Sequence, residues 1–232
     1  SSDVCSSDLI LAYSLGAASL FGVVAPNSGN QKILLKYGTE EQRQKWLVPL
    51  TQGKLESGFS MTEPDNAGSD PRSIKTTARR EGDEWVINGH KWFTSNGKRA
   101  DFLIVMCRTE EPDGDSEVNA KMTQIIVPTD TPGLNIVRGV PVWGGRSDHC
   151  EIKYENVRVP PSNQLGQTGS GHPAAQHRPR PGRLHHCINS VRQLPPLGAY
   201  GQGAATKVHG GFELEKEYEM VYVGLGLTDI AR

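Results

Sequence analysis

The 232-residue sequence has few cysteines, few aromatic residues and almost no excess of charge of either sign. Its four cysteines include no Cys-x-x-Cys pair, which argues against a disulfide framework or a zinc ribbon. The formal net charge of −1 argues against a protein that binds nucleic acid by bulk electrostatics. The His and Cys residues near 149–150 and 185–187 match no common ligand spacing, so we expect no metal site.

Charged residues are also missing from residues 9–25. This length lies at the lower edge of a membrane span, which needs roughly 17–25 apolar residues. Gly16 and Gly22 interrupt the run, and no basic residue precedes it as a secretory signal would require. We therefore favour a buried helix over a membrane span. Residues 1–8 are rich in Ser and Asp and resemble a non-native leader.

The first informative segment runs from Gly58 to Asp70. Phe59 and Met61 alternate with small residues, which predicts a strand with one apolar face, and Pro64 should end it. A second turn follows at residues 67–70, where backbone N–H groups and the Ser69 hydroxyl suit a phosphate or another anion. An ordinary turn is the alternative. Glu63, beside Pro64, we expect to be structural.

The second informative segment runs from Glu84 to Gly97. Asn88-Gly89 is the pair that type I′ turns prefer, so residues 84–87 and 90–94 are predicted to form a hairpin. Trp92 and Thr94 stand two apart and should share one strand face. An indole beside a hydroxyl suits a planar heteroaromatic ring with hydrogen-bonding edges, although such a pair can equally be core and rim. Asn96-Gly97 marks the next reversal.

Together the two segments resemble the flavin-binding wall of the acyl-CoA dehydrogenase family. The family pattern is aromatic-x-hydrophobic-Thr-Glu-Pro, then Gly-Ser-Asp, then Trp-x-Thr. The resemblance implies an FAD cofactor, with Thr94 near the flavin N5 region and Ser69 near a phosphate or the CoA arm of the substrate. The implied cofactor-binding residues in this part of the chain are Phe59, Met61, Thr62, Ser69, Trp92 and Thr94.

The resemblance extends over residues 26–166 and implies a domain plan. We expect a remnant of an N-terminal helical domain at 9–56, a middle domain at 57–165 and a truncated helical region at 166–232. Thr39 with Gln42 predicts a capping box in the first of these regions. The expected fold class is α+β, with a helical N-terminal segment, a central antiparallel β-barrel of six to eight strands and a fragmentary helical C-terminal segment.

The C-terminal third departs from the family pattern. Arg183 matches an arginine that approaches the CoA phosphates in one branch, and a surface arginine is the alternative. Gly210 and Gly211 resemble a late Gly-Gly turn that meets the flavin of a neighbouring subunit, and an exposed loop is the alternative. The family's catalytic carboxylate has no matching position, so the catalytic base is unknown and this chain is expected to be catalytically incomplete.

The resemblance implies a flavoprotein oxidoreductase of fatty acid β-oxidation that introduces an α,β double bond into an acyl-CoA thioester. Its implied partners are acyl-CoA, an electron-transfer flavoprotein or similar acceptor, and further copies in a homodimer or homotetramer. Its expected location is the bacterial cytoplasm, or the mitochondrial matrix in a eukaryote. Two alternatives stay open: a same-fold acyl-CoA oxidase or flavin monooxygenase, and a non-enzymatic acyl-CoA- or flavin-binding remnant.

Overall fold

The computed structural model describes residues 25–171, except 69, 71–72, 111–120 and 142–147, and these residues belong to one compact unit. The predictions for Ser69, Arg183, Gly210, Gly211 and residues 1–8 therefore lie outside the described residues. The same holds for residues 9–24 and for most of the predicted region 166–232. Within the described ranges, no helix has the length and apolar character to cross a membrane.

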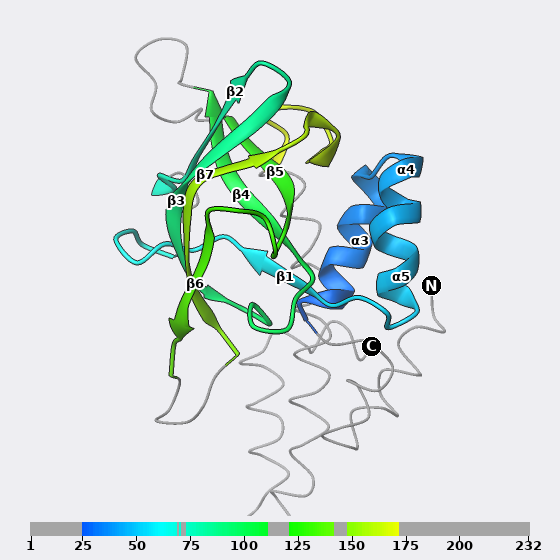
Figure 1. The fold of residues 1–232 in the computed structure, drawn as a ribbon, viewed down its shortest axis with the longest axis horizontal. Coiled ribbons are helices and arrows are strands. Elements are labelled where there is room, and N and C mark those ends of the chain that lie inside the picture. The colour runs from blue at the N-terminus through cyan, green and yellow to red at the C-terminus, as the bar shows by residue number, and fades with distance from the viewer. Residues whose placement is uncertain (1–24, 69, 71–72, 111–120, 142–147, 172–232) are drawn as a thin grey trace, which may run out of the picture. The chain divides into compact units, whose positions relative to one another are not determined.

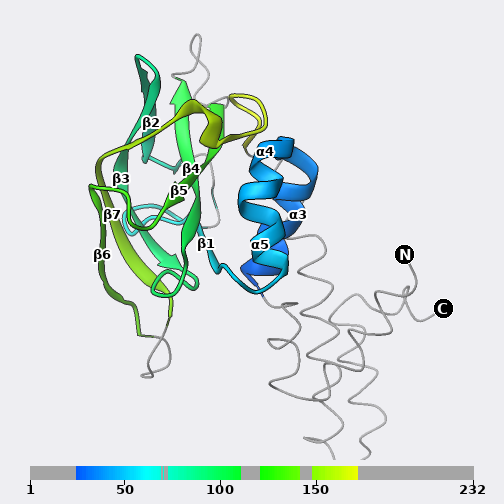
Figure 2. The same ribbon diagram turned by 45° about the vertical axis from the view of Figure 1, so that its right-hand side comes forward.

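Helices occupy the start of the described chain. They are α3 (Asn27–Tyr37), α4 (Glu40–Gln42), the π-helical turn η1 (Arg43–Leu47) and α5 (Val48–Thr51). The predicted capping box is confirmed: the Gln42 N–H donates to the Thr39 hydroxyl at 3.2 Å, and the Thr39 N–H donates to the Gln42 side chain at 2.9 Å. The helices lie together on one side of the sheet (Figures 1 and 2).

The described strands form one eight-stranded sheet with the order β6-β7-β3-β2-β4-β5-β8, and β1 pairs with β4 beside this path. A short 3-10 helix at Pro161–Asn163 precedes the last strand. The strands are β1 (Ser57–Ser60), β2 (Thr77–Glu81), β3 (Glu84–Thr94), β4 (Phe102–Glu110), β5 (Lys121–Pro128), β6 (Leu134–Gly139), β7 (Cys150–Val159) and β8 (Gln164–Leu165).

The sheet differs from the expected antiparallel barrel in two ways. β1 and β2 run parallel to β4, so the sheet is mixed rather than antiparallel. Parallel neighbours need a long connection, and the β2–β3 hairpin lies within the connection from β1 to β4. In the described part of the chain, β6 and β8 end the strand path without pairing with each other, so a closed barrel is not shown. The α+β content, helices followed by a sheet, is as predicted.

β4 separates two hydrophobic clusters, because successive residues of a strand point to opposite faces. Leu103 and Val105 join the cluster that contains Ile152 and Tyr154. Phe102, Ile104 and Met106 join the cluster that faces the helices, where Trp46 contacts Phe102 with ring centroids 4.8 Å apart. Along β7, Cys150, Ile152 and Tyr154 alternate with more exposed residues, and all three are buried.

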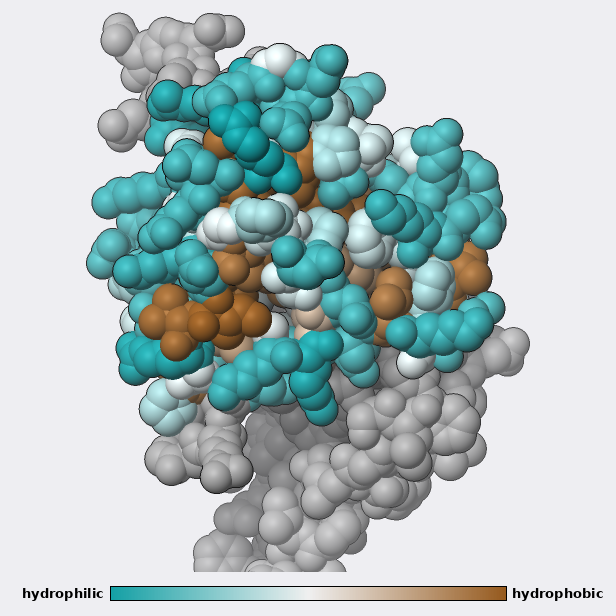
Figure 3. Space-filling model, in the orientation of Figure 1, coloured by the Kyte–Doolittle hydropathy of each residue, from teal (hydrophilic) through white to brown (hydrophobic). Residues whose placement is uncertain are grey.

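β1 is buried along its whole length rather than on one face. Phe59 packs in the cluster beneath the helices, and Ser60 points into the interior, where it bonds to Thr94 and Tyr154. The prediction of one apolar face is confirmed, because Phe59 and the partly buried Met61 pack in the same hydrophobic cluster, while Ser60 makes polar contacts on the other side. At the outer strand β6, by contrast, Ile136 and Val137 are exposed, and Figure 3 shows a hydrophobic patch there.

The prediction of a hairpin turn at Asn88-Gly89 was wrong. β3 runs without a break from Glu84 to Thr94, and the chain reverses instead between Glu81 and Glu84, where Gly82 has φ +59°. Gly89 serves a different purpose, because a Cβ there would collide with the Thr76 side chain. The strand also carries a register irregularity between Ile87 and Gly89. The single glycine here permits close packing and a bulge rather than a turn.

Candidate functional site

One backbone–backbone and one side chain–backbone hydrogen bond join the two motifs that the sequence singled out. The Trp92 N–H donates to the Thr62 carbonyl oxygen at 3.0 Å, and the Thr62 hydroxyl donates to the Trp92 carbonyl oxygen at 2.8 Å. These residues are 30 positions apart in the sequence. The turn after β1 and the end of β3 therefore form one continuous surface, as the predicted pairing of the motifs requires.

This surface offers the groups that a planar heteroaromatic ring needs. Met61, Thr62 and Trp92 are all partly exposed. Within the described part of the chain, the Thr62 N–H donates to no other group, and the Thr62 hydroxyl oxygen keeps capacity to accept. The Trp92 indole is held by an edge contact with Phe93, with ring centroids 4.9 Å apart. A free amide donor, an acceptor and an aromatic face therefore lie side by side.

Thr94 lies inside the sheet rather than on that surface. Thr94 is fully buried, and its hydroxyl oxygen lies 3.0 Å from the Ser60 hydroxyl oxygen. The Ser60 hydroxyl oxygen also accepts a hydrogen bond from the Tyr154 hydroxyl at 2.9 Å. Phe93, with φ +50°, and a register irregularity between Lys91 and Thr94 interrupt the strand alternation. The two-residue spacing therefore does not put Trp92 and Thr94 on one face in the simple way predicted. Flavin contacts of Thr94 and of the buried Phe59 stay predictions.

A buried ion pair supports the turn from beneath. The Lys91 ammonium donates to a Glu63 carboxylate oxygen at 3.0 Å, and both side chains are almost inaccessible to solvent. Lys91 also donates to the Met61 carbonyl oxygen at 2.7 Å. The Glu63 carboxylate accepts further bonds from the Thr76 hydroxyl, the backbone N–H groups of Thr76 and Lys75, and the Asn66 side chain. Glu63 is thus structural, as predicted.

In this pair, burial and the charge of the partner shift each pKa in opposite directions. Burial alone raises the pKa of Glu63, but the Lys91 ammonium and the bonds from Thr76 and Lys75 bring that pKa below its ordinary value. Burial lowers the pKa of Lys91, and Glu63 partly offsets this. Burial raises the pKa of the neighbouring Cys107 thiol to about 12, so the thiol stays neutral. Glu63 is therefore the counter-charge of Lys91.

Sequence reasoning missed the importance of Lys91. A partial signal was present, because Lys91 lies within a predicted strand on the face opposite to Trp92 and Thr94. Lys is almost never fully buried unless it is paired. Ser60 and Tyr154, which support Thr94, were also missed. No pattern in the sequence reveals that pairing, since β1 and β7 are 94 positions apart at this contact.

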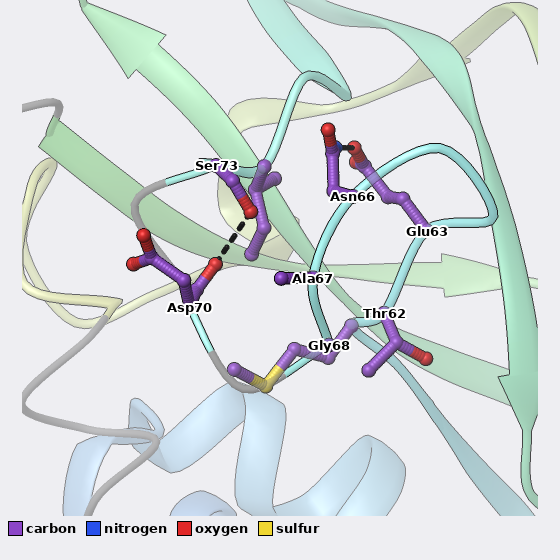
Figure 4. A pocket seen from close by; sticks show the side chains of 9 residues that line it. Thr62, Glu63, Asn66, Ala67, Gly68, Asp70 and Ser73 are labelled. Atoms are coloured by element: carbon purple, nitrogen blue, oxygen red, sulfur yellow. Dashed lines mark hydrogen bonds between the residues drawn. The ribbon is translucent and has the colours of Figure 1, made fainter.

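The loop that follows Thr62 lines a small pocket that is partly open to solvent. Figure 4 shows the loop curving from Thr62 through Asn66 and Gly68 to Asp70 and Ser73. The predicted turn is confirmed by the Asp70 N–H, which donates to the Ala67 carbonyl oxygen at 3.0 Å. A Cβ on Gly68 would lie 3.4 Å from the Thr62 methyl group, so the loop folds closely back on the candidate surface.

The described chain has a helical lead-in, a mixed sheet and a joined Thr62–Trp92 surface. Residues 58–157 match the family model for the acyl-CoA dehydrogenase middle domain, which gives the class of this domain. The chain is 49% identical over 179 residues to a probable acyl-CoA dehydrogenase, FadE2, of Mycobacterium tuberculosis, a match that covers 75% of this chain and 43% of that protein. The chain belongs to the acyl-CoA dehydrogenase family, whose members depend on FAD.

Solved structures agree with this assignment. An acyl-CoA dehydrogenase from Geobacillus kaustophilus is 30% identical with a TM-score of 0.67, and the match covers 84% of this chain and 53% of that one. The prolyl acyl carrier protein oxidase AnaB is 27% identical with a TM-score of 0.71, and the match covers 94% of this chain and 57% of that one. The chain therefore spans less than two thirds of the length of these relatives.

Proposed function

We propose that this chain is the central part of an FAD-dependent acyl-CoA dehydrogenase that introduces an α,β double bond into an acyl-CoA thioester. The observation that carries this proposal is the reciprocal bonding of Thr62 and Trp92, which turns two family motifs into one partly exposed surface. Family membership supplies the reaction class. When bound, FAD supplies the acceptor for the hydride that leaves the substrate β-carbon.

The residues of this surface fit a flavin. The Thr62 N–H and hydroxyl oxygen can bond the pyrimidine edge of the ring, while Trp92 and Met61 provide apolar contact. Phe59 and Thr94 complete the wall from the buried side, where Ser60 orients the Thr94 hydroxyl. Ser69 we assign to a phosphate or the CoA arm. Arg183 we assign to the CoA phosphates, and Gly210 and Gly211 to the flavin of a neighbouring subunit.

Glu63 is unsuited to remove the substrate α-proton. Both carboxylate oxygens already accept hydrogen bonds from Lys75 and Thr76. The pKa of Glu63 also lies below its ordinary value, whereas a general base works best with a pKa near the operating pH. We therefore assign it no catalytic role, and the base stays unidentified. The proposed partners are acyl-CoA, an electron-transfer flavoprotein or similar acceptor, and further copies of the chain in a dimer or tetramer. The proposed location is the bacterial cytoplasm or the mitochondrial matrix.

The test is to purify the full chain, load it with FAD and add acyl-CoA thioesters without oxygen. We expect stable flavin retention, followed by bleaching of the flavin absorbance as the acyl chain is oxidised. Thr62→Val should weaken retention, because it removes the hydroxyl that bonds Trp92. Thr131→Val, on the loop after β5, is the matched control. A chain that retains no flavin would contradict the proposal, and retention without bleaching would favour the non-enzymatic alternative.

An acyl-CoA oxidase is the second candidate, because the chain is similar to a solved oxidase over 94% of its own length. Oxidases and dehydrogenases on this fold differ in whether oxygen re-oxidises the reduced flavin. Release of hydrogen peroxide in air, at the rate at which acyl-CoA is consumed, would favour the oxidase. Turnover that needs an added electron acceptor would favour the dehydrogenase.

A further inference from the structure

Lys91 places its ammonium group against the backbone of the proposed ring-binding turn. Its side chain is 0% exposed, and its ammonium donates to the Met61 carbonyl oxygen at 2.7 Å. A buried charge is strongly unfavourable unless it is paired and hydrogen-bonded. Glu63 supplies the pairing at 3.0 Å, but its carboxylate is shared with donors of Thr76 and Lys75. The ammonium therefore contacts the backbone of the turn as well as its counter-charge.

The carbonyl that Lys91 contacts belongs to the same peptide group as the Thr62 N–H. That N–H bonds no other group in the described chain, and Thr62 is partly exposed. A charge-assisted hydrogen bond is roughly twice as strong as a neutral one. In a low-dielectric setting it polarises the group that accepts it, so the opposite end of the peptide becomes a better donor. Lys91 thus acts on the free donor of the candidate surface through one peptide bond.

We propose that Lys91 is a positioning residue that polarises the Met61–Thr62 peptide and so strengthens the bond from the Thr62 N–H to the bound flavin. This inference rests on the proposed function, namely that the flavin lies against Thr62 and Trp92. Reduction adds negative charge to the flavin ring, so a stronger donor stabilises the reduced form more than the oxidised form. Lys91 therefore raises both the affinity for FAD and the reduction potential of the bound flavin.

The test compares the full wild-type chain with the double variant Lys91→Met, Glu63→Gln, which removes both charges so that neither is left unpaired in the interior. Lys153→Met is the matched control, because Lys153 is exposed on β7, next to the residue that pairs with Lys91. FAD affinity is measured by titration, the reduction potential by equilibration with a reference dye, and folding by circular dichroism.

We expect the double variant to bind FAD about fivefold more weakly, the effect of one net hydrogen bond of roughly 1 kcal/mol. Its bound flavin should also have a more negative reduction potential, which a purely structural role would not change. The control should match the wild type. Equal affinity and potential in the double variant and the control would overturn the inference alone, whereas a wild-type chain that binds no FAD would overturn the proposed function as well.

A second measurement covers the case in which the double variant does not fold. In the wild-type chain labelled with ¹⁵N, the Thr62 amide proton resonance should move downfield when FAD is added, because the free N–H gains an acceptor. The Lys153 amide, on an exposed position of β7, serves as the internal reference. FAD binding without a change at Thr62 would overturn the inference.

Discussion

Glu63→Ala should be among the most destabilising single substitutions on the β1–β3 side of the sheet. The change removes the counter-charge of Lys91 and leaves donors of Thr76, Lys75 and Asn66 without their acceptor. Removing one partner of a buried ion pair destabilises a protein by about 3–5 kcal/mol. Domains of this size are stable by roughly 5–15 kcal/mol, so the variant should lose a large fraction of its stability.

The assay is urea unfolding of the full chain, followed by tryptophan fluorescence and circular dichroism. Glu155→Ala is the control, because Glu155 is exposed and, among the described residues, its carboxylate accepts only a long bond of 3.5 Å from the Asn135 side chain. Adding Lys91→Met to Glu63→Ala should recover part of the loss, since the unpaired charge is then gone. If Glu63→Ala lowers the free energy of unfolding by less than about 1 kcal/mol, the reasoning is refuted, because a loss that small is typical of a solvent-exposed ion pair.

Three further predictions follow from the same contacts. The pKa of Glu63 is lowered in the folded state, so its contribution to stability should be present above its unfolded pKa of about 4.3 and be lost as pH falls through the folded value. The difference in unfolding free energy between wild type and Glu63→Ala should therefore shrink in acid. Gly89→Val should destabilise by about 1–3 kcal/mol, because its side chain would meet Thr76, and an unchanged urea midpoint would contradict this. Thr94→Val should weaken FAD affinity and reduction by acyl-CoA by removing the bond to Ser60, and unchanged absorbance and turnover would count against it.

The sequence alone predicted those features that depend on residues close together in the chain. Thr39 and Gln42 are three residues apart, so the capping box follows from adjacent side chains and backbone groups. The alternation of Phe59 and Met61 with small residues likewise reflects one strand face packed on one core. The pairing of Thr62 with Trp92 was predicted only because two family motifs were considered together. Neither motif alone specifies a bond across 30 positions.

The errors arose where tertiary contacts override local preference. Asn88-Gly89 has a strong turn preference, but the approach of Thr76 requires a glycine in mid-strand, and Gly82 provides the actual reversal. The face shared by Trp92 and Thr94 was inferred from a regular strand, and the positive φ of Phe93 interrupts that regularity. Such a backbone conformation is uncommon for a bulky residue, so the sequence gives no reason to expect it.

The central claim is that Thr62 and Trp92 form a surface that binds the flavin ring, and FAD titration of the full chain tests it most directly. Stacking on an aromatic side chain contributes roughly 1–3 kcal/mol for a nucleobase, a comparable planar ring, so Trp92→Ala should weaken FAD binding by about tenfold or more. Trp92→Phe, which keeps an aromatic face, should stay within a few-fold of the wild type. Saturable binding of one FAD per chain with this order of affinities is the predicted result, and a wild-type chain without FAD binding, or a Trp92→Ala chain that binds as tightly as the wild type, would contradict the account.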